Sequence, residues 1–116
     1  MQVLIVRVAG VTFEGRQAKI ERLNGSEAVR LVPEPENIYD SNALAVQVSK
    51  DGELLHVGYV PRELAAKIAP VLQGETLMVK ILEITGGFQQ HNGFRASLGL
   101  KLKVELPESE VSDISF

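Results

Sequence analysis

Residues 33–44 gather the side chains of this sequence that are best suited to recognising a ligand. The segment reads Pro-Glu-Pro-Glu-Asn-Ile-Tyr-Asp-Ser-Asn-Ala-Leu. Asn37, Asp40 and Asn42 are typical of surface turns, because their short side chains hydrogen-bond the neighbouring backbone. A turn does not require Tyr39, which we expect at the loop apex between them. An aromatic ring beside a carboxylate and amides can stack on a flat group and hydrogen-bond its edge or its sugar. The segment therefore predicts a binding site.

The sequence offers little for catalysis. The absence of cysteine excludes disulfides and thiolate metal sites. His56 and His91 lack the close spacing of a metal-binding pair, so we expect both to be ordinary surface residues. No nucleophile elbow, phosphate-binding loop or dinucleotide-binding glycine pattern is present. We therefore predict a binding domain that is not an enzyme and uses no cofactor or metal. One alternative stays open, in which Glu34, Glu36 and Asp40 hold a divalent cation for phosphodiester hydrolysis.

The acidity of the chain is concentrated at its end. The formal net charge is -3, yet the last twelve residues hold four acidic residues and no basic one. The body therefore carries eleven acidic against twelve basic residues, which permits nucleic-acid binding without pointing to it. No apolar run approaches the roughly 20 residues that span a bilayer. We expect no membrane association and a cytoplasmic location.

Apolar periodicity predicts the elements that must carry this loop. Apolar residues alternate through residues 43–49 and 54–60, and Asp51-Gly52 between them favours a two-residue hairpin turn, because both residues tolerate positive φ. Pro61 suits a helix start, an apolar stripe follows at helical spacing, and Pro70 is expected to end or kink that helix. A shorter helix or an irregular turn is expected over residues 15–23. Strands are expected over residues 1–9, 28–33, 43–49, 54–60, 77–84 and 95–104.

Six strands with one or two short helices favour a single, mainly β domain. We predict a small antiparallel barrel or half-open sheet over residues 1–104, followed by an acidic, disordered tail over residues 105–116. In the core, the inward-facing side chains of the central hairpin and of the last strand should lie together. These are Leu44, Val46, Leu55, Val57, Leu98 and Leu100.

Two motifs resemble a known family. The pattern Glu34-Pro35-x-Asn37-x-Tyr39-Asp40-x-Asn42-Ala43 is followed by a hairpin and by Val57-Gly58-Tyr59-Val60-Pro61-Arg62. This combination closely resembles the HIRAN domain, and Val8-x-Gly10-x-x-Phe13 and Leu31 also fall at the family's positions. The match extends over residues 3–104. It implies a six-stranded, OB-like antiparallel β-barrel of the kind found in helicase-type DNA remodellers and in stand-alone bacterial proteins.

In the remodellers the HIRAN domain grips the 3′ end of single-stranded DNA, and the resemblance implies the same partner here, in DNA repair or replication-associated processes. It implies that Tyr39 and Phe13 sandwich the terminal base and that Asp40 accepts the terminal hydroxyl. Asn37 would help to hold the loop or the base, and Arg62 would contact a phosphate. The implied nucleic-acid-binding residues are Phe13, Asn37, Tyr39, Asp40, Tyr59 and Arg62.

The chain departs from the family's pattern in two places. Where the DNA-binding members carry an Arg and two Tyr, this chain reads Thr12, Phe13, Glu14. The resemblance therefore implies that the Arg contact is missing and that Glu14 repels a phosphate. Ile38 replaces the family's usual Pro, which is a milder change.

Two further hypotheses concern protein partners. On the same barrel, Phe13, Tyr39 and Tyr59 would pack on a peptide, with no DNA bound. The tail places acidic residues before Ile114-Ser115-Phe116, which is similar to the acidic tip that docks bacterial single-stranded DNA-binding protein on its partners. The alternative for this tail is a solvated, disordered end that improves solubility.

Overall fold

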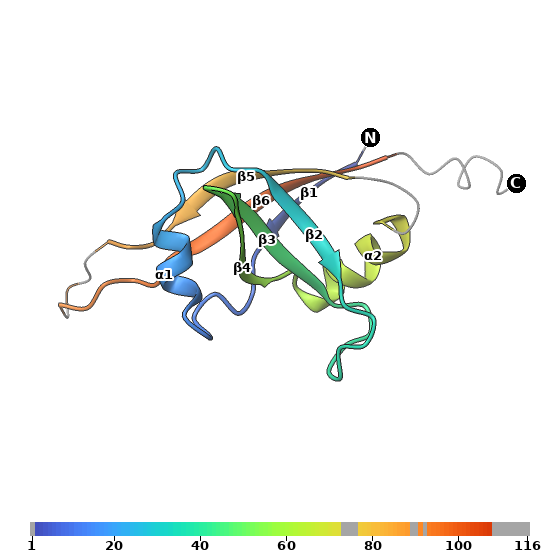
Figure 1. Cartoon of the computed structure of the whole chain (residues 1–116), viewed down its shortest axis with the longest axis horizontal. Helices are drawn as coiled ribbons and strands as arrows, with labels where there is room; N and C mark the ends of the chain where they lie inside the picture. The colour runs from blue at the N-terminus through green and yellow to red at the C-terminus, as the bar shows by residue number, and fades with distance from the viewer. Residues whose placement is uncertain (1, 73–76, 89–90, 92, 108–116) are drawn as a thin grey trace, which may run out of the picture.

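A computed structural model describes residues 2–72, 77–88, 91 and 93–107 (Figure 1). The strands form two antiparallel three-stranded sheets, in the orders β1-β6-β5 and β2-β3-β4. The predicted mainly β fold with two short helices is thus confirmed. The elements follow one another as β1 (Gln2–Arg7), α1 (Arg16–Glu21), β2 (Val29–Pro33), β3 (Leu44–Lys50), β4 (Glu53–Tyr59), α2 (Arg62–Leu72), β5 (Met78–Thr85) and β6 (Gly99–Leu106).

The predicted six-stranded barrel is not confirmed, because the strands form two separate sheets. Between the two sheets the backbone pairs only through isolated bridges in the described residues, at Ala9 with Tyr59 and at Ala28 with Lys80. Figure 1 shows the β2-β3-β4 sheet crossing the longer strands of the other sheet. Each of these two places has a single bridge, so in the described residues no continuous ladder of hydrogen bonds joins the two sheets.

The central hairpin follows its sequence closely. Asp51 and Gly52 have φ of 51° and 82°, both in the left-handed region that a tight hairpin turn requires. At the other end of β4, a side chain at Gly58 would collide with the Ala9 carbonyl oxygen. Glycine there lets the end of β1 approach β4, and the Ala9 N–H donates to the Tyr59 carbonyl at 2.7 Å. This contact fixes the neighbouring residue, Tyr59, in the site described below.

The core lies between the two sheets, as the alternation of apolar residues predicts. Five of the six predicted core side chains are buried, and Leu98 is half-buried against them. The difference arises because β6 begins at Gly99 and not at residue 95. The Gln17 side chain accepts from the Leu98 N–H at 2.8 Å and donates to the Leu98 carbonyl at 2.8 Å. Gln17 therefore takes the two backbone groups that a neighbouring strand would use.

The ends of two elements also differ from the prediction. Helix α2 continues through Pro70 to Leu72, and no helix in the described ranges is long and apolar enough to cross a membrane. Strand β6 continues to Leu106, which is buried, so residues 105 and 106 belong to the sheet and not to a tail. Residues 108–116, with the predicted protein contact at Phe116, lie outside the described residues.

Candidate functional site

The loop between β2 and β3 is held by its own polar side chains. Asn37 Oδ1 accepts from the backbone N–H groups of Tyr39 at 2.8 Å and Asp40 at 3.2 Å. Its Nδ2 donates to Glu34 Oε1 at 3.0 Å, and the Asn42 N–H donates to Asp40 Oδ1 at 2.9 Å. These bonds fix the loop and leave the Tyr39 side chain 83% exposed. The structure thus gives Asn37 the first of its two implied roles, holding the loop.

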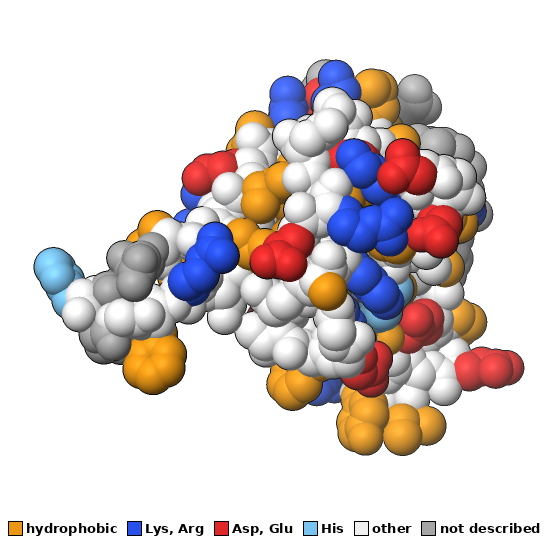
Figure 2. Space-filling model, turned by 60° about the vertical axis from the view of Figure 1, so that its left-hand side comes forward, with side chains coloured by type: hydrophobic (Ala, Val, Ile, Leu, Met, Phe, Trp, Pro, Cys, Tyr) orange, Lys and Arg blue, Asp and Glu red, His pale blue; other side chains and the backbone are white. Residues whose placement is uncertain are grey.

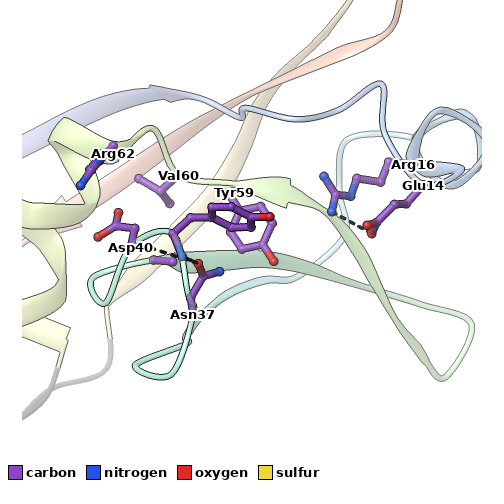
Figure 3. Close-up of a pocket in the computed structure, with 9 residues that line it drawn as sticks. Glu14, Arg16, Asn37, Asp40, Tyr59, Val60 and Arg62 are labelled. Carbon is purple, nitrogen blue, oxygen red and sulfur yellow. Dashed lines mark hydrogen bonds and ion pairs between the residues drawn. The ribbon is translucent and has the colours of Figure 1, made fainter.

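Five of the six predicted site residues line one open pocket of about 400 Å³. Figure 3 shows Arg62 and Asp40 at one end of this pocket, Arg16 and Glu14 at the other, and Tyr59 between them. Arg62 begins α2, Tyr59 ends β4, and Asp40 comes from the β2–β3 loop. The cluster therefore depends on β3 and β4, which bring the loop and the helix start together.

Tyr59 is the anchored aromatic residue of the pocket. Its hydroxyl donates to Glu34 Oε1 at 3.0 Å, and the Arg16 guanidinium lies 5.4 Å from its ring centroid. Burial raises the pKa of Tyr59, and the hydrogen bond to Glu34 adds to the effect, so the phenol stays neutral at physiological pH. The ring of His56 packs edge-on at 5.0 Å.

The two histidines have different environments. His56 is half-buried, and burial, reinforced by the charge of Arg16, lowers its pKa. The prediction that His56 is an ordinary surface residue is therefore wrong, because the side chain is half-buried and its ring packs against Tyr59. His91 is exposed, as predicted.

Arg16 also lines the pocket, although it was not among the predicted site residues. This residue is only 6% exposed, although it lies at the first position of α1. Its Nη1 donates to the Gly10 carbonyl at 2.7 Å, and its Nη2 donates to Glu14 Oε2 at 3.1 Å. Its Nε is buried with no hydrogen-bond partner among the described residues. One signal was available, since Arg16 precedes the apolar Ile20 by four residues and so shares its helix face.

Phe13 and Arg62 differ in their relation to the pocket. Phe13 is 64% exposed and lies in the β1–α1 loop beside Glu14, outside the pocket lining. Phe13 is thus the one predicted site residue that does not line the pocket. Arg62 is exposed and also lines a second open pocket of about 380 Å³, together with residues 37–42 of the loop.

The acidic side chains near the pocket do not form a metal centre. Within the described residues, no three His, Asp or Glu side chains are placed to hold a metal ion. Glu34 Oε1 already accepts hydrogen bonds from Tyr59 and Asn37. Figure 2 shows acidic and basic side chains interspersed on the face it displays, so that face has no strip of one charge that would track a long strand.

The sequence model of the HIRAN domain family matches residues 1–107. This chain belongs to the HIRAN domain family. A putative SWI/SNF-related matrix-associated actin-dependent regulator of chromatin from Arabidopsis thaliana is 41% identical over 59 residues, which cover 51% of this chain and 6% of that protein. This HIRAN chain therefore spans a small part of that relative's length.

Two solved structures share the fold of this HIRAN domain. The crystal structure of the HIRAN domain of human HLTF has 23% sequence identity and a TM-score of 0.57, with 97% of this chain and 83% of that chain covered. A crystal structure of a protein from Lactobacillus plantarum has 23% identity and a TM-score of 0.58, with 89% and 95% covered. The HIRAN resemblance inferred from the two sequence motifs is thus confirmed for the family, whereas the OB-like barrel that it implied is not confirmed.

Proposed function

We propose that this HIRAN domain is a non-catalytic module that binds single-stranded DNA at its 3′ end, in DNA repair or replication-associated processes. The observation that carries the proposal is the convergence of two tyrosines, two carboxylates and two arginines on one open pocket. The pocket joins a flat apolar surface to hydrogen-bonding and cationic groups. A terminal nucleotide presents the matching base, hydroxyl and phosphate.

The two tyrosines supply the stacking surface. Tyr39 stands exposed on a loop that its own hydrogen bonds hold in place, and Tyr59 is fixed by Glu34 and Arg16. The Tyr59 ring therefore needs little further ordering when a base arrives, and the Tyr39 backbone is already in place. Stacking of a base on an aromatic side chain contributes about 1–3 kcal/mol, whatever the base.

Asp40 supplies the preference for an end. Its Oδ1 accepts from the Asn42 N–H, and its Oδ2 has no hydrogen-bond partner in the described part of the chain. A carboxylate repels phosphates, so its place in a DNA site needs a donor that offsets this repulsion. The 3′ hydroxyl of a strand is such a donor, whereas an interior deoxyribose has none. A hydrogen bond to a charged acceptor contributes about 1.5–3 kcal/mol.

Arg62 supplies the phosphate contact. It is exposed and forms no ion pair with any described residue, so its guanidinium is available to a strand at the Asp40 end of the pocket. With few such contacts, binding should be modest and should weaken as salt rises. The footprint should accordingly be a short strand end and not a long groove.

The proposal is tested by fluorescence anisotropy with a short single strand labelled at its 5′ end, at low and moderate salt. The wild-type domain should bind in a salt-sensitive way without cleaving the strand. Tyr39→Ala should weaken binding by about 1–3 kcal/mol through lost stacking, whereas Tyr39→Phe, which keeps the ring, should bind like the wild type. Absence of strand binding at both salt concentrations would contradict the proposal and favour a peptide ligand for the same pocket.

A further inference from the structure

At one end of the pocket Arg16 is a buried cation with fixed partners, and not an exposed cation that is free to contact a ligand. The guanidinium is almost completely buried, and the Gly10 carbonyl and the ring of Tyr59 hold its position. Its remaining ion-pair partner is Glu14, through Nη2 at 3.1 Å. Figure 3 shows the two side chains meeting at the end of the pocket opposite Asp40 and Arg62. The anion-binding edge of Arg16 is thus present, and a carboxylate of the same chain occupies it.

The backbone at Glu14 makes this arrangement unlike an ordinary surface ion pair. Glu14 has φ of 54°, in the left-handed region that residues other than glycine rarely adopt. Gly15 follows with φ of 74°, so two successive left-handed residues turn the chain directly before α1. The Glu14 side chain is 78% exposed, and an exposed ion pair stabilises a fold very little. Fold stability therefore does not account for the strained conformation at Glu14.

We propose that Arg16 forms a phosphate subsite, that the Glu14 carboxylate occupies this subsite in the free protein, and that a phosphate of the bound strand displaces it. The inference rests on the proposed function of the pocket as a strand-end site. Carboxylate and phosphate accept hydrogen bonds from the same edge of a guanidinium. Because Glu14 is exposed and Arg16 is fixed, the acid can move aside while the base stays in place.

The exchange follows from the charges at the two ends of the pocket. In the free protein the pocket lining holds two arginines against Glu14 and Asp40, so its charges balance. A ligand without a phosphate gains nothing by displacing Glu14 and leaves Arg16 paired as before. A strand phosphate carries one negative charge, as the Glu14 carboxylate does, so it can take the place of that carboxylate without unbalancing the charges of the pocket. Because a strand must displace Glu14 from Arg16, Glu14 lowers the affinity of the pocket for every strand. Uncharged ligands gain nothing from this displacement, so they bind even more weakly at this end of the pocket.

The subsite is tested first with inorganic phosphate and the full chain carrying Glu14→Gln. Phosphate should raise the thermal midpoint of Glu14→Gln more than that of the wild type, relative to chloride at the same ionic strength. The matched control is Glu36→Gln, which makes the same change of charge at an exposed loop position outside the pocket lining. Equal responses of the two variants would overturn the subsite, because they would reduce the effect to overall charge.

The second measurement uses the labelled single strand. Glu14→Gln should bind it about fivefold more tightly than the wild type at low salt, as expected for removal of an exposed competing ion pair, and Glu36→Gln less than twofold more tightly. In an Arg16→Lys background, which removes the planar fork, the gain from Glu14→Gln should fall to that of the control. If Arg16→Lys does not fold by circular dichroism, the comparison of Glu14→Gln with Glu36→Gln decides alone.

The outcomes separate this inference from the proposed function. A wild-type domain that binds the strand, together with a Glu14→Gln variant that gains no more than Glu36→Gln, would overturn the subsite and leave the strand-end proposal standing. A domain that binds no strand in either form, but whose Glu14→Gln variant gains phosphate binding, would support the subsite and overturn the strand-end proposal.

Discussion

The two ends of the pocket use the same residue type in opposite ways. Arg62 is exposed at the start of α2 and forms no ion pair with any described residue. Arg16 is buried. It donates hydrogen bonds to the Gly10 carbonyl and the Glu14 carboxylate, and its guanidinium lies over the Tyr59 ring. A free arginine can follow a ligand, whereas a fixed one also supports the fold around it. Substitutions at the two ends should therefore separate effects on stability from effects on binding.

The largest difference should appear when each arginine is replaced by leucine. Arg16→Leu leaves the Gly10 carbonyl and the Tyr59 ring without their partner, so it should lower the free energy of unfolding by about 3 kcal/mol. Arg62→Leu should change it by less than about 0.5 kcal/mol while weakening strand binding. Urea denaturation measures the first quantity and anisotropy the second. Equal losses of stability in the two variants would contradict the distinction between the two ends.

The same distinction holds for two carboxylates that pair with a base. The Glu27 side chain is 5% exposed and accepts from the N–H groups of Asn24 at 2.7 Å and Gly25 at 2.8 Å, and from Lys50 Nζ at 3.0 Å. Burial alone would raise its pKa, but these hydrogen bonds outweigh burial and lower the pKa from 4.5 to about 2. Glu14 has one exposed contact.

Glu27 should therefore make the stability of the domain depend on pH. Because folding lowers the Glu27 pKa, its contribution is fully present above pH 4.5 and is lost as the pH falls toward 2. Glu27→Gln should lower the free energy of unfolding by about 2 kcal/mol at neutral pH, and the difference from wild type should shrink across that window. Glu14→Gln should stay within about 0.5 kcal/mol at neutral pH. A constant deficit for Glu27→Gln down to pH 2 would contradict the assignment.

Local patterns predicted the parts of the structure that local forces decide. The Asp51-Gly52 hairpin depends on two residues that tolerate positive φ, and the two motifs that contain Tyr39 and Arg62 lie on either side of it. The hairpin then brings these motifs to one pocket. The family and most of the pocket could accordingly be predicted from short stretches of sequence.

Contacts between distant residues account for what the sequence did not predict. Gln17 shortens β6 by binding Leu98, 81 residues away. Arg16 is buried because the β1–α1 loop and Tyr59 close around it, and neither contact is visible in the spacing of residues near Arg16. The barrel prediction is not confirmed for the same reason, since closure depends on pairing between sheets and not on the alternation within one strand.

The claim that the pocket reads a strand end is tested most directly by changing the end. The same 5′-labelled single strand is prepared with a 3′ hydroxyl and with a 3′ phosphate, and both are titrated with the wild-type domain and with Asp40→Ala. A 3′ phosphate brings about -1.5 to -2 charges against Asp40 and removes the donor that the carboxylate would accept. The wild type should bind the hydroxyl end about tenfold more tightly or better, and Asp40→Ala should bind the two ends alike. Equal affinity of the wild type for the two ends would contradict end recognition.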